Sequence, residues 1–245
     1  MLFNARKGSV QPLGLLDRGV HNCLMHSSNE LQAIYSERFS AHIEYRRAVW
    51  RVLVSQYFSK FVPPDAHVLD LGCGYGEFIN HVSCKKKLAM DLNTRAREYL
   101  SQDVDFILQD CCHAWPIPDD SLDVVFTSNF FEHLASKDAL RKTLEQVRRC
   151  LKPGGRIVAM GPNIKYIGGA YWDFWDHHLA LTHSSLSEAL RVLGFDLDRV
   201  VQRFLPYTMV NRRRVPSVLV RMYLQVPWAW GLFGKQFLIV ASKPK

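Results

Sequence analysis

The chain has 245 residues, 48% of them hydrophobic and 22% charged, which is long and apolar enough for a domain with a sizeable core. A disordered tail and a mini-protein are excluded. The net charge of +8 is unevenly distributed: nine of the 31 lysines and arginines follow residue 198, and none of the 23 acidic residues does. Residues 1–198 therefore carry 22 basic against 23 acidic side chains, and the excess positive charge lies in the last fifth of the chain.

The cysteines and the apolar segments indicate the compartment. The six cysteines form no Cys-x-x-Cys pair, and Cys111 and Cys112 are adjacent, which predicts reduced thiols in a cytosolic protein. No apolar core of a signal peptide is visible at the start. The most apolar long stretch, 215–233, contains two prolines, an arginine and a glutamine, so it is not expected to span a membrane. We expect a cytoplasmic protein, with peripheral contact of residues 206–235 with the inner face of a membrane as an open alternative.

The first part of the chain predicts an arm and helices. Residues 1–28 show no periodicity, whereas apolar residues between 29 and 60 recur at helical spacing and predict one long helix or two shorter ones. Pro63 and Pro64 break this pattern. Short apolar runs then predict strands at 68–71, 88–91, 104–108, 122–127 and 156–160.

The rest of the chain continues the alternation of strands and helices. A helix with an apolar stripe precedes the strand at 156–160, and a second helix is predicted from the capping box Ser185-Leu-Ser-Glu188 to Gly194. Two more strands are predicted near 200–205 and at 236–241. Strands separated by helices indicate an α/β fold with a doubly wound, Rossmann-like sheet. We expect seven mostly parallel strands with the last antiparallel, helices on both faces and an N-terminal helical extension.

The expected domain organisation follows from these elements. Residues 1–60 form the N-terminal arm and its helix or helices, and residues 61–245 form the main domain. Two insertions are expected within that domain, an acceptor-pocket segment at about 161–184 and a basic aromatic segment at about 206–235.

A glycine-rich loop follows the first predicted strand. It reads Asp70-Leu-Gly-Cys-Gly-Tyr-Gly76, and Glu77 opens the next predicted helix. Glycines let the backbone turn tightly and approach a ligand at the edge where open α/β sheets bind nucleotides. A dinucleotide-binding loop would need glycine at 77, where this chain has a carboxylate that repels a pyrophosphate. The loop therefore suits a cofactor without phosphate.

Five ordered stretches resemble motifs of class I S-adenosylmethionine-dependent methyltransferases, particularly methyltransferase type 11. They are Val68-Leu-Asp-Leu-Gly-Cys-Gly-Tyr-Gly76, Asp91, Asp110, Pro116-Ile-Pro-Asp-Asp-Ser-Leu-Asp-Val-Val125 and Leu151-Lys-Pro-Gly-Gly-Arg156. The resemblance covers roughly residues 45–160 and implies S-adenosyl-L-methionine as cofactor. It implies that Asp91 accepts hydrogen bonds from the ribose and that Asp110 contacts the adenine. The expected cofactor-binding residues are Asp70, Gly72, Cys73, Gly74, Gly76, Asp91, Leu92, Asp110, Cys111 and Asn129.

An alternative interpretation gives these residues structural roles alone. The glycines would then only make a tight turn, Asp91 would cap the next helix, and the protein would be a non-catalytic module that binds the cofactor or RNA. Against RNA or DNA base methylation, Ser128-Asn-Phe-Phe131 replaces the Asn/Asp-Pro-Pro-aromatic motif that such enzymes of this fold usually carry after the fourth strand.

Candidate catalytic residues follow the fourth and fifth predicted strands. Methyl transfer needs a base only when the acceptor loses a proton, and His133 is the first candidate because imidazole titrates near neutral pH. The alternative is that Glu132 and His133 only orient their loop. His177 and His178 lie in a segment rich in aromatic and acidic residues that suits an acceptor pocket. A metal site formed by Asp176, His177, His178 and His183 is a further interpretation, but adjacent residues seldom all ligate one ion, and we expect no metal.

The acceptor is indicated by resemblance and by the basic tail. Gly161-Pro-Asn-Ile-x-Tyr-x-Gly-Gly169 resembles methyltransferases of bacterial sugars and envelope glycans, which implies O-methylation of a sugar hydroxyl, including a lipid-linked one, in polysaccharide biosynthesis. A small molecule or natural product is the alternative acceptor. In residues 199–245, basic and aromatic residues interleave, as is typical of a segment on an anionic lipid surface. An ordinary packed helix with solvated arginines remains the other interpretation of this tail.

Overall fold

The structure, a computed structural model, describes residues 43–207 and 214–245. The arm at 1–28, the helical pattern between 29 and 42, and residues 208–213 lie outside the described residues. The elements in chain order are α2 (Ile43–Gln56), η2 (Phe58–Phe61), β1 (His67–Leu71), β2 (Lys86–Asp91), η3 (Thr94–Tyr99), β3 (Val104–Leu108), β4 (Leu122–Ser128), η4 (Phe131–His133), α3 (Lys137–Cys150), β5 (Leu151–Pro162), α4 (Ile164–Ile167), η5 (Gly168–Asp173), α5 (His183–Val192), β6 (Asp196–Val201), α6 (Ser217–Leu224), α7 (Pro227–Phe233) and β7 (Gln236–Ser242).

One seven-stranded sheet in the order β3-β2-β1-β4-β5-β7-β6 organises the chain. The strands from β1 to β5 pair in parallel, and β7 runs antiparallel to both β5 and β6, which confirms the predicted fold class. The order reverses between β1 and β4, because β1 leads outward to β2 on one side and has β4 on the other. In such sheets, ligands bind at the carboxyl ends of the strands beside this reversal.

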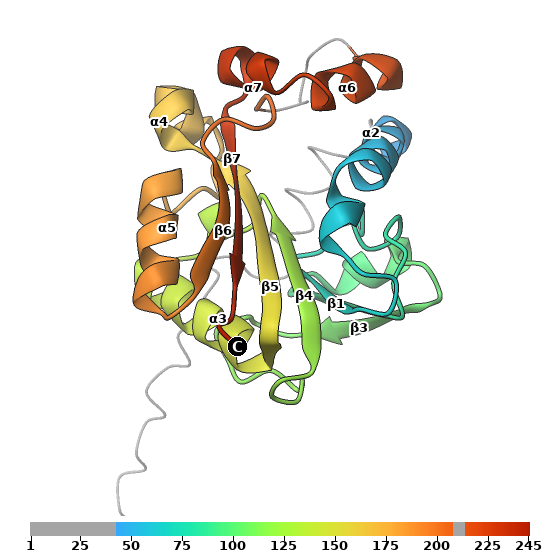
Figure 1. Ribbon diagram of the computed structural model, residues 1–245, viewed down its shortest axis with the longest axis vertical. Helices are drawn as coiled ribbons and strands as arrows, with labels where there is room; N and C mark the ends of the chain where they lie inside the picture. The colour runs from blue at the N-terminus through green and yellow to red at the C-terminus, as the bar shows by residue number, and fades with distance from the viewer. Residues whose placement is uncertain (1–42, 208–213) are drawn as a thin grey trace, which may run out of the picture.

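Two hydrophobic clusters cover the two faces of the sheet. One joins α3 and α5 to the sheet, and the other joins α2, η2, α6 and α7 to it. Figure 1 shows α3 and α5 on one side and α2 on the other, with α6 and α7 across one end of the molecule. Because both faces are covered, β1 and β4 are buried along most of their length, as their apolar sequences predict.

Helix α3 illustrates how the sequence positions an element. The Ser136 side chain accepts a hydrogen bond from the Ala139 backbone N–H and caps the helix. Leu140, Leu144 and Val147 are buried along one stripe, and each such side chain contributes about 1.5–3 kcal/mol by leaving water. Strand β5 begins at once, at Leu151 rather than at residue 156 as predicted. Within the Pro-Gly-Gly segment, the Gly154 N–H donates to the Lys243 carbonyl just after β7.

Two other local predictions are wrong. The segment after the glycine loop forms turns and no regular helix, since the Ile79 N–H is bonded to the Asp70 carboxylate. Helix α5 begins at His183, because the reciprocal capping bonds join Thr182 and Ser185 and not Ser185 and Glu188.

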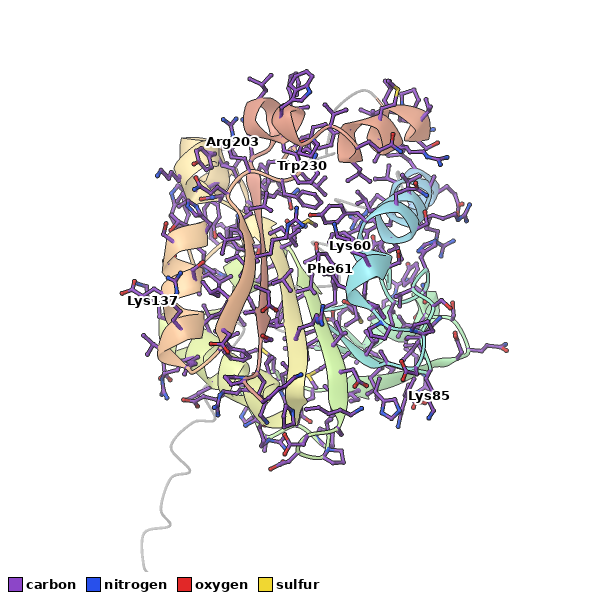
Figure 2. The ribbon with its side chains drawn as sticks, in the orientation of Figure 1. Lys60, Phe61, Lys85, Lys137, Arg203 and Trp230 are labelled. Atoms are coloured by element: carbon purple, nitrogen blue, oxygen red, sulfur yellow. The ribbon has the colours of Figure 1, made fainter. Side chains whose placement is uncertain are left out.

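The strand predicted near 200–205 is β6 and lies four residues earlier. Gly194 adopts φ +78 at the end of α5, so the chain reverses there and pairs with β7 from Asp196. Phe204 lies beyond the strand and packs in an aromatic group with Tyr57 and Trp230, at ring-centroid distances of 4.6 and 5.0 Å. Trp230 lies between α7 and the sheet (Figure 2), so this group attaches α7 to the core.

The cysteines agree with the prediction at four described positions. Cys73, Cys84, Cys111 and Cys150 are free thiols. The prediction of six reduced cysteines is wrong at Cys112, which is disulfide-bonded. The sequence argument considered only the neighbouring Cys111, with which a relaxed disulfide is sterically unfavourable. Cys23 is outside the described residues. Within 43–207 and 214–245, no helix combines the length and the apolar character needed to cross a membrane.

Candidate active site

The glycine loop is held against the end of β2. The Gly72 and Cys73 N–H groups both donate to the Met90 carbonyl, at 2.9 and 3.2 Å. Gly72 and Gly76 have φ values of +69 and +70, a region that other residues rarely adopt. A side chain at Gly72 would also collide with Phe130, whose ring atoms lie 2.3 Å from the place of a Cβ. The loop thus requires glycine for its conformation and for the close approach of Phe130.

Asp91 lies beside this loop at the end of β2. Its Oδ2 accepts a hydrogen bond from the Gly74 N–H at 2.8 Å, and its Oδ1 accepts one from the Asn93 N–H at 2.8 Å. Burial raises the pKa of Asp91 and outweighs the lowering by these backbone donors. Each oxygen has a second lone pair, so the carboxylate can still accept hydrogen bonds from ligand hydroxyls.

The other predicted cofactor-binding residues divide by where their side chains lie. The Cys73 and Cys111 thiols are buried in the two hydrophobic clusters, and Leu92 packs against one of them. Burial raises the pKa of Cys111 to about 12, although the thiol lies beside the Thr143 hydroxyl at 3.2 Å. Cys73 and Cys111 can therefore contact a ligand only through their backbone atoms.

Asp70, Asp110 and Asn129 stand at the ends of their strands. Asp70 is buried, and burial together with the nearby Glu77 raises its pKa well above the usual range. Asp110 is buried and accepts a hydrogen bond from the Cys112 N–H at 3.0 Å. Asn129 is exposed, has φ +50 and donates from Nδ2 to the Ser128 hydroxyl at 3.0 Å. Asp70 thus holds the loop from within, while Asn129 is open to a ligand.

His133 and Asp176 form a pair that the sequence reasoning missed. The Nδ1 atom of His133 is 2.9 Å from the Asp176 backbone oxygen and 3.2 Å from its Oδ2. Burial lowers the pKa of His133, but the hydrogen bond to Asp176 and the charges of Glu132 and Asp176 raise it by more, so the net shift is upward. His133 also lies near enough to Asp91 for its positive charge to lower the pKa of that carboxyl.

Glu132 anchors the predicted acceptor segment to the end of β4. Its backbone oxygen accepts hydrogen bonds from the His178 and Leu179 N–H groups at 2.8 and 3.0 Å. Its side chain is buried, and burial raises the pKa of the carboxyl to about 7. Sequence reasoning treated Glu132 only as an orienting residue, and no local signal shows that it contacts a segment more than forty residues away.

The predicted histidines are brought together only in part. The rings of His133 and His177 are 5.1 Å apart, and the His177 Nδ1 is 2.9 Å from the Tyr171 backbone oxygen. His183 instead contacts the Asn163 amide at 2.9 Å and the Ser184 hydroxyl at 3.2 Å. Among the described residues, the metal-ligand types that converge here are Glu132, His133 and His177, within 4.8 Å of one another, and not the set with His178 and His183.

Glu77 forms an ion pair that the sequence analysis did not predict. Arg46 of α2 forms an ion pair with it, with 2.6 Å between Nη2 and Oε1. The repulsion of a pyrophosphate by Glu77 is therefore weaker than predicted, and the missing third glycine is the stronger argument against a dinucleotide. Arg46 also shows that α2 covers the glycine loop.

Comparison with known proteins identifies this arrangement. The family described as "Methyltransferase domain" matches residues 69–159, which include the glycine loop, Asp91 and the chain as far as β5. This match indicates a methyltransferase domain in residues 69–159. A malonyl-[acyl-carrier protein] O-methyltransferase of Methylococcus capsulatus is 27% identical over 176 residues. That match covers 65% of this chain and 60% of the relative, less than two thirds of the relative's length.

Solved structures agree with the fold. A SAM-dependent methyltransferase from Archaeoglobus fulgidus matches with a TM-score of 0.62 and 21% identity, covering 84% of this chain and 99% of that one. A chain in the complex of the Haloferax volcanii Trm112 methyltransferase activator with a methyltransferase matches with a TM-score of 0.64 and 18% identity, covering 90% and 100%. At these identities the likeness concerns the fold alone.

The residues present fit S-adenosylmethionine, the cofactor of this family. The glycines keep side chains out of the loop at the sheet's reversal point, and a Cβ at Gly76 would lie 2.6 Å from Leu100. Asp91 offers acceptor oxygens beside the loop, as ribose hydroxyls require. Residues 70–76 contain no lysine or arginine that would mark a phosphate site. Arg46 of α2 lies close to the loop but is paired with Glu77.

Proposed function

We propose that this methyltransferase transfers the methyl group of S-adenosylmethionine to a hydroxyl oxygen of a sugar or envelope glycan, with a lipid-linked glycan as the preferred acceptor. The observation that carries the proposal is the His133–Asp176 pair near Asp91. A hydroxyl must lose its proton as its oxygen is methylated, and this pair supplies a base at the end of the sheet where the cofactor residues lie.

The chain's own residues have separate roles in this scheme. Gly72, Gly74, Gly76 and Asp91 hold the cofactor, with Asp70 and Asp110 behind them and Asn129 at the open edge. The bound sulfonium supplies a methyl group that is already activated. Because the Asp176 oxygens can only accept, the His133 Nδ1 keeps its hydrogen, and Nε2 is the atom that receives the acceptor's proton.

The acceptor segment supplies the remaining groups. His177 packs between Phe174, with ring centroids 4.9 Å apart, and His133, and we assign it a hydrogen bond to the acceptor. His178 is held by Glu132 at its backbone and is assigned the same kind of contact. Exposed Trp172 and half-buried Phe174 offer aromatic faces on which a sugar ring can stack. Positioning by these groups contributes up to about 7–11 kcal/mol to catalysis in favourable cases.

The malonyl relative points to a second acceptor class, a small molecule or carrier-bound carboxylate. A carboxylate is methylated without losing a proton, so it needs no base. The His133–Asp176 pair would then have no proton to remove, and this favours the hydroxyl acceptor. A small-molecule natural product with a hydroxyl group remains the runner-up, and a non-catalytic module that binds cofactor or RNA comes after it.

The basic aromatic segment 206–235 supports a lipid-linked acceptor. No acidic residue follows residue 198, and cationic and aromatic residues together suit peripheral contact with an anionic membrane. Such contact would bring the catalytic end to the lipid that carries the glycan.

Label transfer tests the function. Purified protein and methyl-labelled S-adenosylmethionine are incubated with fractionated cell extract, and label in glycolipid or glycan that resists mild base is the expected result. Base-labile label would indicate a carboxyl ester and overturn the hydroxyl acceptor. Absence of label in every fraction, together with no cofactor binding by calorimetry, would overturn the enzymatic function. His133→Gln distinguishes the chemistry, since it should lower methyl transfer to a hydroxyl by about 10²–10⁴, whereas methyl transfer to a carboxylate would be unchanged.

A further inference from the structure

Large apolar side chains are exposed on α6 and α7. Of the twelve such side chains exposed among residues 43–207 and 214–245, seven lie between Val215 and Phe233. Six of these are on the two helices: Val218, Leu219, Met222, Trp228, Leu232 and Phe233. Trp228 is 73% and Phe233 61% exposed, whereas their neighbour Trp230 is buried. Exposed apolar side chains gathered on two helices that contact each other mark a candidate binding surface.

The predicted acceptor segment contributes to the same end of the molecule. Trp172 and Trp175 are exposed there, at 56% and 81%. Arg203 joins the two parts: its guanidinium donates to the Leu232 and Gly234 carbonyls and lies 5.0 Å from the ring centroid of Tyr166 in α4. Figure 1 shows α4, α6 and α7 at the same end. The exposed side chains of α6 and α7, with Trp172 and Trp175, are called the docking surface below.

The docking surface lies at the carboxyl end of the parallel strands. Strand β7 begins at Gln236, which pairs with Pro162 at the end of β5, and α7 ends three residues before it. His133 and Asp176 follow β4 and β5 at this same end. A flat partner bound to the docking surface would therefore lie next to the proposed acceptor site.

Charge selects the partner. Arg214 and Arg221 are exposed beside the apolar side chains, and residues 199–245 contain no acidic residue. Apolar contact alone would serve a second copy of this chain, but a like-charged copy would bring these arginines together. Tryptophans with arginines on one face match an anionic bilayer, where the rings enter the interface and the guanidinium groups contact the headgroups.

We propose that the docking surface binds an anionic phospholipid bilayer and holds the acceptor site against it. The biological purpose of this binding, the delivery of a lipid-linked acceptor, rests on the proposed function. The binding itself needs no acceptor. Membrane binding and methyl transfer can therefore be measured separately, and either can fail without the other.

Sedimentation with vesicles tests the binding. The full chain is mixed with phosphatidylcholine vesicles that contain or lack phosphatidylglycerol. We expect binding to the anionic vesicles only, weakened by added salt. Trp228→Ser with Phe233→Ser should lower the partition coefficient about tenfold or more, and Arg214→Ala with Arg221→Ala should reduce the preference for anionic lipid.

A control removes an apolar side chain that is exposed at the opposite end of the sheet. Val192→Ser should bind as the unmodified chain does, because Val192 is 80% exposed at the end of α5, just before β6 starts at the other end of the sheet. The proposal is overturned if the unmodified chain does not bind anionic vesicles, if Val192→Ser lowers binding as much as Trp228→Ser with Phe233→Ser does, or if neutral vesicles bind equally well. Light scattering completes the test: a dimer that Trp228→Ser with Phe233→Ser dissociates would assign the surface to a second copy instead.

Discussion

The Nδ1 atom of His133 contacts both the backbone oxygen and the carboxylate of Asp176, at 2.9 and 3.2 Å. The two residues lie 43 positions apart and follow different strands of the sheet. The contacts fix which ring nitrogen carries hydrogen and also fix the plane of the ring. If His133 is the proposed base, its contact with Asp176 resembles that of a histidine with its orienting carboxylate in hydrolytic triads.

Asp176→Asn is expected to shift the pH profile of methyl transfer. The Asp176 hydrogen bond and charge raise the pKa of His133, so their loss lowers it. Only neutral imidazole accepts a proton, and activity rises with pH through this pKa. The rising limb of kcat/KM, measured between about pH 5 and 9, should therefore move to lower pH, while kcat at high pH falls because the ring loses its orientation.

Two further variants are needed to interpret this experiment. His133→Gln should lower kcat by about 10²–10⁴ and remove the rising limb. Asp173→Asn, an exposed carboxylate of the same segment, should leave profile and rate unchanged. An unshifted rising limb in Asp176→Asn would show that Asp176 does not raise the pKa of the group that controls activity.

Gly72→Ala is expected to destabilise the fold and abolish cofactor binding. The left-handed backbone at Gly72 costs a substituted residue about 1–3 kcal/mol, and the new Cβ would collide with Phe130. Adding Phe130→Ala should relieve the collision but not the backbone strain, so stability recovers only in part. Gly169→Ala is the control, because nothing lies within 4 Å of its Cβ position. Urea denaturation and calorimetry measure the two effects, and equal stability of both alanine variants would contradict the geometry.

Asp91→Asn is expected to weaken S-adenosylmethionine binding without unfolding the protein. A hydrogen bond to a charged group is worth about 1.5–3 kcal/mol, which corresponds to roughly 10–150-fold in the dissociation constant. The amide retains one acceptor oxygen, so loop geometry should largely survive. Asp103→Asn is the matched control, since this exposed carboxylate pairs with Lys87 far from the loop. Unchanged affinity in Asp91→Asn would remove Asp91 from the site.

Trp230→Ala is expected to lower the free energy of unfolding by about 3–5 kcal/mol, whereas Trp228→Ala should change it by less than about 0.5 kcal/mol. Trp230 is buried against Tyr57 and Phe204, and its indole N–H donates to the Tyr223 carbonyl at 2.9 Å. Trp228 lies two residues away and faces outward. Chemical denaturation of both variants gives the comparison, and similar losses would mean that α7 is not attached through Trp230.

The strands and the cofactor loop were predictable because their signals are local. Val104–Leu108 was predicted at its observed bounds, and the glycine loop was read from its spacing. A strand buried on both faces, such as β4, is mostly apolar, and a left-handed turn favours glycine, so these elements can be predicted from their own residues. The same reasoning failed after Gly76, where the Ile79 N–H donates to the Asp70 carboxylate and the segment forms turns.

The acceptor side was predicted less well because its geometry is assembled from distant segments. His133, His177 and His178 were selected by type, but the contacts of His133 with Asp176 and of Glu132 with His178 depend on how β4 and β5 end side by side. Helices α6 and α7 show the same limit: Val220 and Leu224 are buried while Leu219 is exposed, so the packed-helix interpretation describes one face, and membrane contact of the other face stays a prediction.

The segment between β6 and β7 begins and ends at one point in space. The Lys235 and Gln236 N–H groups both donate to the Leu205 carbonyl, at 2.8 and 3.0 Å, so the chain leaves the sheet and returns to it beside the same residue. A segment closed in this way can change in length and composition without altering the register of β7 against its neighbours. We therefore expect that the docking surface can change in sequence while the sheet and the glycine loop keep their geometry.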